Sequence, residues 1–461
     1  MAALLHDRDA DNSQNEQQLG TDAPQLSTQV PHIDWSSTPE LILTDIFRML
    51  PVLDRMNMSQ VCSAWLKASS NPLIWRHFDY GVVHPEGTPT DVENMIAQLR
   101  SNHKQYLSII QDYGEKFSQV HIVLYCQESF DVLLYLADYC DTNNLKCSIV
   151  ERYDSSVHLP PDFKRTLCLF LTSNADVQEI YFRNIYFEGD TQNSSIPIGP
   201  ANARCLRKLS FVNSFQDNSL CSLMYLVNLT ELTIFPPHIQ CAWLSCLAKA
   251  SLRTLNIVGK SGMWEFDFHN LPESTWRQIT KSSAKLTVNC YLMDLCSKVV
   301  CPGMPLATFV CCEYFSLEFS RILMLLTPFA ETLSTFVDFS LVERSYQFKP
   351  LVADDDIIKI IQKCSKLTTL AVKNCLHSST ILLIVQLNPN LKDPIIRDDM
   401  IQYDLYIPES IRLTQQVQTY TEENFSKDKF ATAMSCLLKR EWCPLPPEEY
   451  FQVLKSKYCI W

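Results

Sequence analysis

A short pattern of apolar residues recurs along most of the chain and limits what the chain can fold into. Each copy reads apolar-x-x-apolar-x-apolar, as in Leu252, Leu255 and Ile257, and most neighbouring copies lie roughly 20 to 35 residues apart. The clear copies begin at Phe117, Val177, Leu206, Leu229, Leu252, Leu306 and Leu367, and poorer copies begin at Leu286 and Leu333. Because residues two apart share one face of a strand, each copy predicts a short strand with one buried face.

The segments between these copies have the spacing of helices. Val132, Leu133 and Leu136 share one helical face, and Ile357 and Ile361 share another. Strand and helix therefore alternate, and the strand pattern matches that of a leucine-rich repeat. Such units bury their apolar faces by stacking on one another, which predicts an α/β horseshoe solenoid. A compact α/β domain with parallel strands would show the same alternation and is the alternative.

Composition argues against most catalytic and cofactor-binding folds. Only 9 of the 461 residues are glycine, and they never form the clusters that bring backbone close to a phosphate. The cysteines lack the paired spacing of a zinc site, and no Ser, Cys or His lies in a nucleophile motif. We therefore expect no cofactor, no metal and no catalytic residue. An enzyme whose residues meet only in space is a remote alternative.

Charge and hydropathy favour a chain inside the cell that binds neither nucleic acid nor a membrane. The net charge is −12 and no basic stripe is evident, which disfavours a nucleic-acid partner. No apolar stretch approaches the ~18 residues that span a bilayer, so no membrane partner is expected. The first residues lack a secretory signal, and the 19 cysteines are expected to be reduced thiols. These features predict a location in the cytoplasm and/or the nucleus.

Residues 34–80 differ from the repeats and carry a three-part motif. A helical stripe runs through residues 42–50 and is stopped by Pro51, and a second helix ends before Pro72. The runs 39–51 (PELILTDIFRMLP), 61–65 (VCSAW) and 72–76 (PLIWR) resemble, in order and spacing, the motif of the F-box family. Together with the repeats, the chain is similar to F-box proteins with leucine-rich repeats. The alternative is an ordinary small helical bundle.

The resemblance implies an adaptor that performs no bond chemistry itself. F-box proteins bind the Skp adaptor, which links them to a cullin, a RING subunit and a charged ubiquitin-conjugating enzyme. By this resemblance the chain is the non-catalytic, substrate-recognition subunit of an SCF-type ubiquitin ligase, acting on an unknown protein substrate. A non-degradative scaffold is the alternative. The residues expected to bind the Skp adaptor are Pro39, Ile42, Leu43, Ile46, Phe47, Leu50, Val61, Cys62, Trp65 and Trp75.

The substrate is expected on the concave face of the solenoid. In each predicted strand the residues that alternate with the buried ones point away from the helices. The resulting candidates for substrate binding are Glu179, Tyr181, Arg183, Lys208, Glu231, Thr233 and Lys373.

These observations divide the chain into five parts. We expect a disordered N-terminal tail at 1–33, the F-box at 34–80 and linking helices at 81–116. The leucine-rich-repeat solenoid is expected at 117–410, and a C-terminal capping helix and tail at 411–461. The alternative for the aromatic C-terminal residues is a docking peptide.

Overall fold

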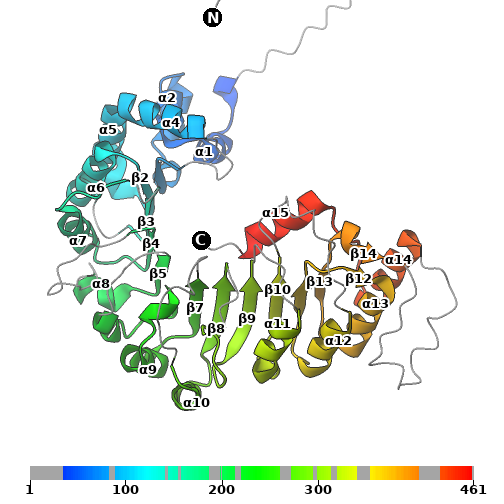
Figure 1. The fold of residues 1–461 in the computed structure, drawn as a ribbon. Helices are drawn as coiled ribbons and strands as arrows, with labels where there is room; N and C mark the ends of the chain where they lie inside the picture. Colours follow the sequence, from blue (N-terminus) through cyan, green and yellow to red (C-terminus); the bar gives the residue numbers. More distant parts are fainter. Residues whose placement is uncertain are drawn as a thin grey trace, which may run out of the picture.

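The chain forms a short N-terminal helical domain followed by a curved sheet with helices along its outer side (Figure 1). This computed structural model describes residues 35–82, 89–140, 144–153, 157–185, 198, 200–212, 220–259, 271–293, 298–312, 319–339, 354–403 and 426–458. The expected tail at 1–33 lies outside these residues.

The N-terminal helical domain is built from short helices separated by prolines. Its elements are η1 (Trp35–Ser37), α1 (Glu40–Met49), α2 (Val52–Met58), α3 (Ser63–Ser69) and η2 (Pro72–Trp75). Pro39 and Pro51 directly precede α1 and α2. At the start of a helix the missing N–H of proline costs no hydrogen bond, whereas a helix that came before the proline would have to end there. The side chain of Asn71 accepts a hydrogen bond from the Leu73 N–H and so begins η2.

Two further helices join this domain to the horseshoe. α4 (Pro89–Ser101) and α5 (His103–Tyr113) are followed by η3 (Gly114–Lys116), and α5 continues the outer layer of helices by packing on α6. The segment between α3 and α4 also holds β1 (His77–Tyr80), which pairs in parallel with the next strand. The sheet therefore begins within residues 34–80.

Within the described residues, the main sheet has twelve parallel strands in sequence order. They are β1, β2 (Gln119–Leu124), β3 (Cys147–Arg152), β4 (Glu179–Arg183), β5 (Lys208–Val212), β6 (Glu231–Ile234), β7 (Thr254–Gly259), β8 (Thr287–Leu292), β9 (Leu306–Cys311), β10 (Thr335–Asp338), β11 (Thr369–Ala371) and β13 (Asp393–Ile395). Each strand pairs with its neighbours along the chain, as stacked repeats require. The predicted horseshoe is confirmed, and the compact α/β alternative is wrong.

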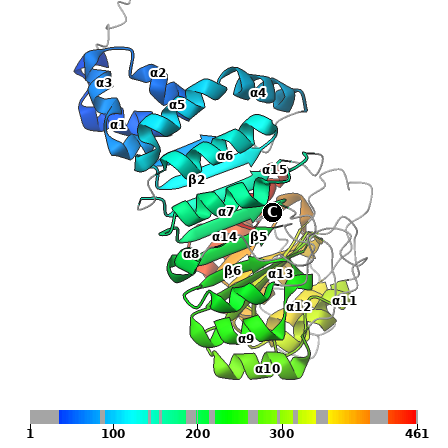
Figure 2. The same ribbon diagram turned by 90° about the vertical axis from the view of Figure 1, so that its left-hand side faces the viewer.

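The helices stack along the outer side of the curve, as Figure 2 shows for α6 to α10. They are α6 (Gln127–Tyr139), α7 (Phe163–Ser173), α8 (Pro200–Cys205), η4 (Leu220–Tyr225), η5 (Pro236–His238), α9 (Cys241–Ala250), α10 (Glu273–Ser282), α11 (Phe319–Leu326), η7 (Thr327–Phe329), α12 (Asp354–Lys363) and α13 (Ser378–Leu387). The inward residues of the repeat pattern, such as Leu255 and Ile257, are fully buried against them. This continuous apolar layer is the core of the solenoid.

Strands β8 and β3 differ from the sequence pattern. In β8 the buried residues are Val288 and Cys290, one position earlier than the predicted Asn289 and Tyr291, and the register shifts beside this point. β3 has no copy in the predicted list because Ser148 occupies a buried position that the pattern reserves for an apolar residue.

The C-terminal residues return to the sheet after the last repeat. β12 (Leu376–His377) pairs in parallel with β14 (Ile401–Gln402), and η9 (Asp398–Met400) directly precedes β14. α14 (Lys427–Leu438) packs on α13 at the end of the outer layer, whereas α15 (Pro447–Tyr458) lies on the inner side of the curve (Figure 1).

Candidate functional site

An apolar cleft of about 230 Å³ opens on the N-terminal helical domain. Its lining consists of Trp35, Leu43, Ile46, Phe47 and Trp65. The indole N–H of Trp65 donates to the Trp35 carbonyl oxygen at 3.2 Å, which holds η1 over α3, and the Phe47 ring meets Trp65 edge-on. A cleft lined in this way offers no acid, base or nucleophile, but it can accept an apolar side chain from another protein.

Large apolar side chains are exposed on the two helices that form this cleft. On α1, Leu41, Ile42 and Met49 are 71%, 51% and 78% exposed, and their spacing places them on one face. Val61 precedes α3 and Leu66 lies on it, and both are exposed as well. Five such side chains on so small a domain are more than isolated surface residues explain, and they mark an interaction surface.

The interior of the domain is held by Trp75. This side chain is fully buried, and its ring stacks on Tyr113 of α5 with centroids 3.8 Å apart and planes 5° apart. Its indole N–H donates to the Ser69 carbonyl oxygen at 2.7 Å. Trp75 therefore joins three segments of the chain internally and presents no surface to a partner.

Arg55 fixes the domain to the start of the sheet. Its buried guanidinium donates to the carbonyl oxygens of Leu50 at 2.8 Å, Ile74 at 2.9 Å, His77 at 2.7 Å and Arg48 at 3.3 Å. Burial lowers the pKa of Arg55, and the nearby Asp79 carboxylate opposes that shift. The charge is retained because several carbonyl dipoles replace the lost water.

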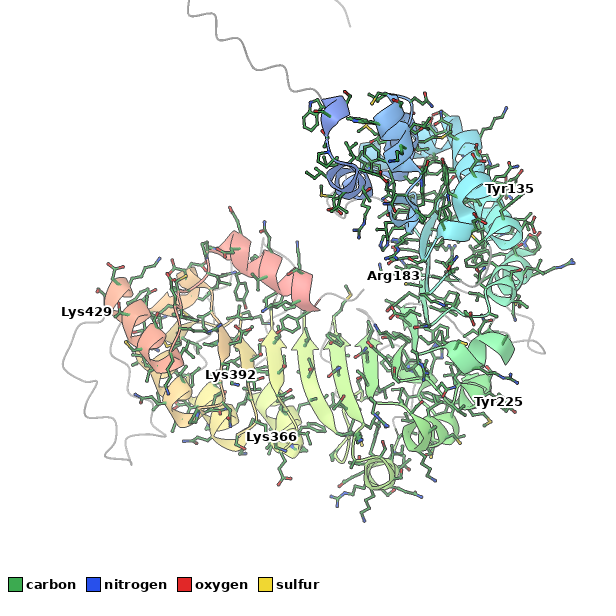
Figure 3. The ribbon with its side chains drawn as sticks, turned by 180° about the vertical axis from the view of Figure 1, so that it is seen from behind. Tyr135, Arg183, Tyr225, Lys366, Lys392 and Lys429 are labelled. Carbon is green, nitrogen blue, oxygen red and sulfur yellow. The ribbon has the colours of Figure 1, made fainter. Side chains whose placement is uncertain are left out.

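The open part of the concave face carries charges that neutralise one another. Glu151 of β3 lies 3.5 Å from His121 and 3.4 Å from Arg183, the residues facing it from β2 and β4. Burial by itself would raise the pKa of Glu151, but His121 and Arg183 hold it below its ordinary value. Figure 3 shows Arg183 on the inner side of the curve and Tyr135 and Tyr225 on the outer side.

A second polar group continues across β4 to β8. Lys208 lies 2.9 Å from Glu179, which also accepts a hydrogen bond from the Tyr181 hydroxyl at 2.9 Å. The hydrogen bond to Glu179 raises the pKa of Lys208. Next to this group the Asn256 amide donates to Glu231 at 3.0 Å and to the Thr233 hydroxyl at 3.2 Å. The surface can exchange hydrogen bonds and ion pairs with a protein, but it has no excess of either charge.

The concave face changes character at β9. Its outward residues there are apolar, and they are covered by Tyr450, Phe451 and Leu454 of α15. The covered set comprises Val310, Cys312, Val337, Phe339, Ala371 and Ile395. The Tyr450 hydroxyl donates a hydrogen bond to the Val372 carbonyl oxygen at 3.2 Å. This hydrogen bond holds α15 on the sheet in addition to the apolar packing. The concave surface left open therefore belongs to the earlier strands.

The described residues were compared with the requirements of a metal site and of a membrane-spanning helix. No three or more His, Cys, Asp or Glu side chains there gather as metal ligands would. Nor is any helix in the same residues long and apolar enough to cross a membrane.

Comparison with known proteins agrees with the geometry. The F-box-like family model matches residues 35–80, the N-terminal helical domain together with β1. The mouse F-box/LRR-repeat protein 21 is 23% identical over 354 residues, which cover 74% of this chain and 77% of that protein. Residues 35–80 thus match the F-box-like family, and most of the chain is similar to F-box proteins with leucine-rich repeats. We use F-box for the N-terminal helical domain and horseshoe for the repeats.

Two other matches are narrower. The mouse F-box/LRR-repeat protein 12 is 44% identical over 41 residues, which cover 9% of this chain and 13% of that protein. A solved structure of a mandelate racemase/muconate lactonizing enzyme from Jannaschia sp. CCS1 covers 62% of this chain and 78% of its own at 9% identity. Its TM-score of 0.17 gives no information about this fold.

The F-box residues expected to bind the adaptor fall into three groups by exposure. Pro39, Ile42 and Val61 are exposed, and Ile46, Leu50, Cys62 and Trp65 are half-buried. Leu43, Phe47 and Trp75 are buried; Leu43 and Phe47 line the cleft, whereas Trp75 does not.

Sequence reasoning missed exposed members of the same surface. They are Trp35, Leu41, Met49 and Leu66. The signal was present on α1, because Leu41, Ile42 and Met49 are spaced as a second helical stripe beside the one that forms the core.

The horseshoe residues expected to bind a substrate are brought together in part. Glu179, Tyr181, Arg183, Lys208 and Glu231 are half-buried on neighbouring strands of the open concave face. Thr233 lies among them but is buried beneath Asn256. Lys373 is separate, because it lies 3.2 Å from the buried Asp338 in the region that α15 covers.

Proposed function

We propose that this protein is the substrate-recognition subunit of an SCF-type ubiquitin ligase, with its F-box bound to a Skp adaptor. The observation that carries the proposal is the apolar surface of α1 and α3, where a cleft of about 230 Å³ is surrounded by exposed Leu41, Ile42 and Met49. The match of residues 35–80 to the F-box-like family supports the same partner.

The contribution of the protein to ubiquitin transfer would be proximity. The adaptor and the cullin would hold the F-box near the charged conjugating enzyme, and the horseshoe would hold the substrate. α5 packs on α6, so a substrate on the concave face would be carried at a fixed place relative to the F-box. Such positioning raises the effective concentration of the substrate lysine at the thioester without any catalytic residue in this chain.

Capture of the Skp adaptor by the full-length chain tests the proposal. The double variant Ile42→Asp and Val61→Asp places two charges on the exposed surface and should reduce capture by about tenfold or more. The matched control is Leu134→Asp, which places a charge on an exposed leucine of α6 outside the F-box. Equal capture by wild type and the double variant, with both chains folded, contradicts the proposed docking surface.

A second measurement separates the ligase role from a non-degradative scaffold. Proteins captured by the wild-type horseshoe are compared in abundance before and after inhibition of the cullin complex. Accumulation of a captured protein, absent with the Ile42→Asp and Val61→Asp variant, supports the ligase role. Unchanged abundance of every captured protein supports the scaffold.

A further inference from the structure

A row of cations lies along the edge of the horseshoe where the strands begin. It comes from the ends of α8, α9 and α10 and from the turns that lead into β5, β7 and β8. We call this row the basic edge, and its members are Arg204, Arg207, Lys249, Arg253, Lys281 and Lys285, all of them exposed.

The backbone fixes these residues along one line. The N–H of Arg207 donates to Gln178, Thr230 donates to Arg207, Arg253 donates to Thr230, and Thr287 donates to Arg253. Each step crosses from one strand to the next, about 4.8 Å. The basic edge therefore extends over β5 to β8, roughly 15 Å, with two cations at each of three of the four strands.

The three segments that carry this row are themselves free of acidic residues. Residues 200–212, 241–259 and 274–293 contain no Asp or Glu at all, although the whole chain has 51 of them and a net charge of −12. Some other exposed cations do have acidic partners, as Arg277 has Glu273 and Lys359 has Asp356. The guanidinium of Arg207 instead donates to the Asn228 carbonyl oxygen at 3.3 Å, which leaves its charge uncompensated.

Helix dipoles account for only half of the basic edge. Arg204, Lys249 and Lys281 lie in the last turns of their helices, where a cation is favoured. Arg207, Arg253 and Lys285 lie beyond the helix ends, in the turns before the strands, and gain little from the dipole because its effect fades within one turn. These three residues are all positively charged and all lie at the same edge of the sheet, which indicates that the edge itself has a function.

We propose that the basic edge binds an acidic segment of a partner protein, a run of Asp and Glu in extended conformation. An extended chain advances about 3.3 Å per residue, so five or six residues span the row and meet a cation at nearly every strand. Arg207 and Arg253 can each take a carboxylate with two hydrogen bonds. The cations are dispersed along a line and do not converge on one point, which fits successive carboxylates better than a single phosphate group.

This surface was missed in the sequence, where no basic stripe is evident. The cations are separated by up to forty or so residues and become neighbours only when the repeats stack. The basic edge is separate from the F-box surface, so its test is independent of adaptor binding.

A labelled ten-residue glutamate peptide is the probe, and its binding to the full-length chain is followed by fluorescence anisotropy. The triple variant Arg207→Glu, Arg253→Glu and Lys285→Glu should weaken binding by about tenfold or more at an ionic strength near 0.1 M. The matched control is Lys104→Glu, Arg165→Glu and Lys455→Glu, which changes the net charge equally at exposed positions away from the edge. The control should bind the peptide within about twofold of wild type.

Two results would overturn the proposal. Equal losses in the triple variant and the control show that the peptide senses net charge and not the edge. Tighter, edge-dependent binding of a phosphoserine peptide or of oligothymidylate shows that the edge selects phosphate over carboxylate. A ten-residue glutamine peptide should show no binding, and the circular dichroism and adaptor capture of the triple variant should match wild type, because all three residues are exposed in turns.

Discussion

The guanidinium of Arg55 donates a hydrogen bond to the carbonyl oxygen of His77 at 2.7 Å, and this contact joins an F-box helix to the first strand of the horseshoe. The same group also binds the Ile74 carbonyl oxygen, at the end of the F-box. His77 then begins β1, which pairs with β2 of the first repeat. The Arg55 side chain thus links the F-box and the horseshoe by donating hydrogen bonds to backbone carbonyl oxygens of both.

Replacing Arg55 by Met should loosen this link. The variant leaves buried carbonyl oxygens without donors, and hydrogen bonds to a charged donor are worth about 1.5–3 kcal/mol each in favourable cases. We expect the free energy of opening of the F-box to fall by about 3 kcal/mol, measured by hydrogen exchange of amides in α2 and β1. Arg48→Met is the control, because Arg48 is exposed and pairs only with exposed Asp45. Unchanged exchange in Arg55→Met would show that these hydrogen bonds do not hold the domain.

Much of the fold could be predicted because the apolar positions of the repeat pattern are the buried positions of the strands. Leu255 and Ile257 are separated by one residue, and burial on one face of a strand requires that spacing. The pattern missed β3, where the polar Ser148 occupies a buried position, and it was weak at β10, where the polar Asp338 does so. The position of α15 inside the curve also could not be predicted, since an amphipathic helix shows which residues it buries but not against what.

The candidate sites were less predictable than the fold. A helical stripe identifies buried residues such as Phe47, whereas a partner meets exposed ones such as Leu41. The basic edge contains residues of different repeats, such as Arg207 and Lys285. These residues become neighbours only through the alignment of successive strands, which the sequence pattern does not specify closely. Contacts between repeats are therefore where structure adds most to the sequence.

Tyr450 should be the main anchor of α15. Its side chain is almost fully buried against the apolar concave strip, so Tyr450→Ala should cost about 3–5 kcal/mol in the local stability of β10, β11 and α15. Tyr450→Phe keeps the packing, loses only the hydrogen bond to Val372, and should cost about 1 kcal/mol. Hydrogen exchange of β10 and β11 measures both, with the exposed Lys455→Ala as control. Equal protection in Tyr450→Ala and wild type would mean that α15 does not stabilise the strands beneath it.

Asp338 and Lys373 should make stability depend on pH. Asp338 is fully buried, and burial raises its pKa above the ordinary value although Lys373, 3.2 Å away, acts in the opposite direction. A raised folded-state pKa means that the folded protein keeps its proton where the unfolded chain has lost it. The contribution of this carboxyl therefore falls as the pH rises above the ordinary aspartate pKa, and it stops falling above the raised value.

Removing Lys373 should enlarge this effect. Lys373→Met leaves the Asp338 carboxylate unpaired and should cost about 3–5 kcal/mol at neutral pH, with a smaller loss in acid, where the native carboxyl is protonated. Adding Asp338→Asn to Lys373→Met should recover most of the loss, because no buried charge remains. Urea denaturation of the single and double variants over a range of pH measures both expectations. A loss that is the same at all pH values would assign the effect to packing and not to charge.

Trp75 and Ile42 should affect adaptor capture by different routes. Trp75 is buried and stacked on Tyr113, so Trp75→Ala should cost about 3–5 kcal/mol of F-box stability and reduce capture only as far as the F-box unfolds. Ile42 is exposed, so Ile42→Asp should reduce capture with little change in stability.

Measuring capture and thermal unfolding on the same preparations separates the two routes. Trp75→Phe is the conservative variant, because a smaller ring can keep the contact with Tyr113 while the hydrogen bond to Ser69 is lost. It should restore most of the capture that Trp75→Ala loses. If Trp75→Ala weakens capture while the F-box melts as in wild type, Trp75 contacts the adaptor after a rearrangement that exposes it. If Ile42→Asp weakens capture only in proportion to unfolding, the exposed face of α1 is not the docking surface.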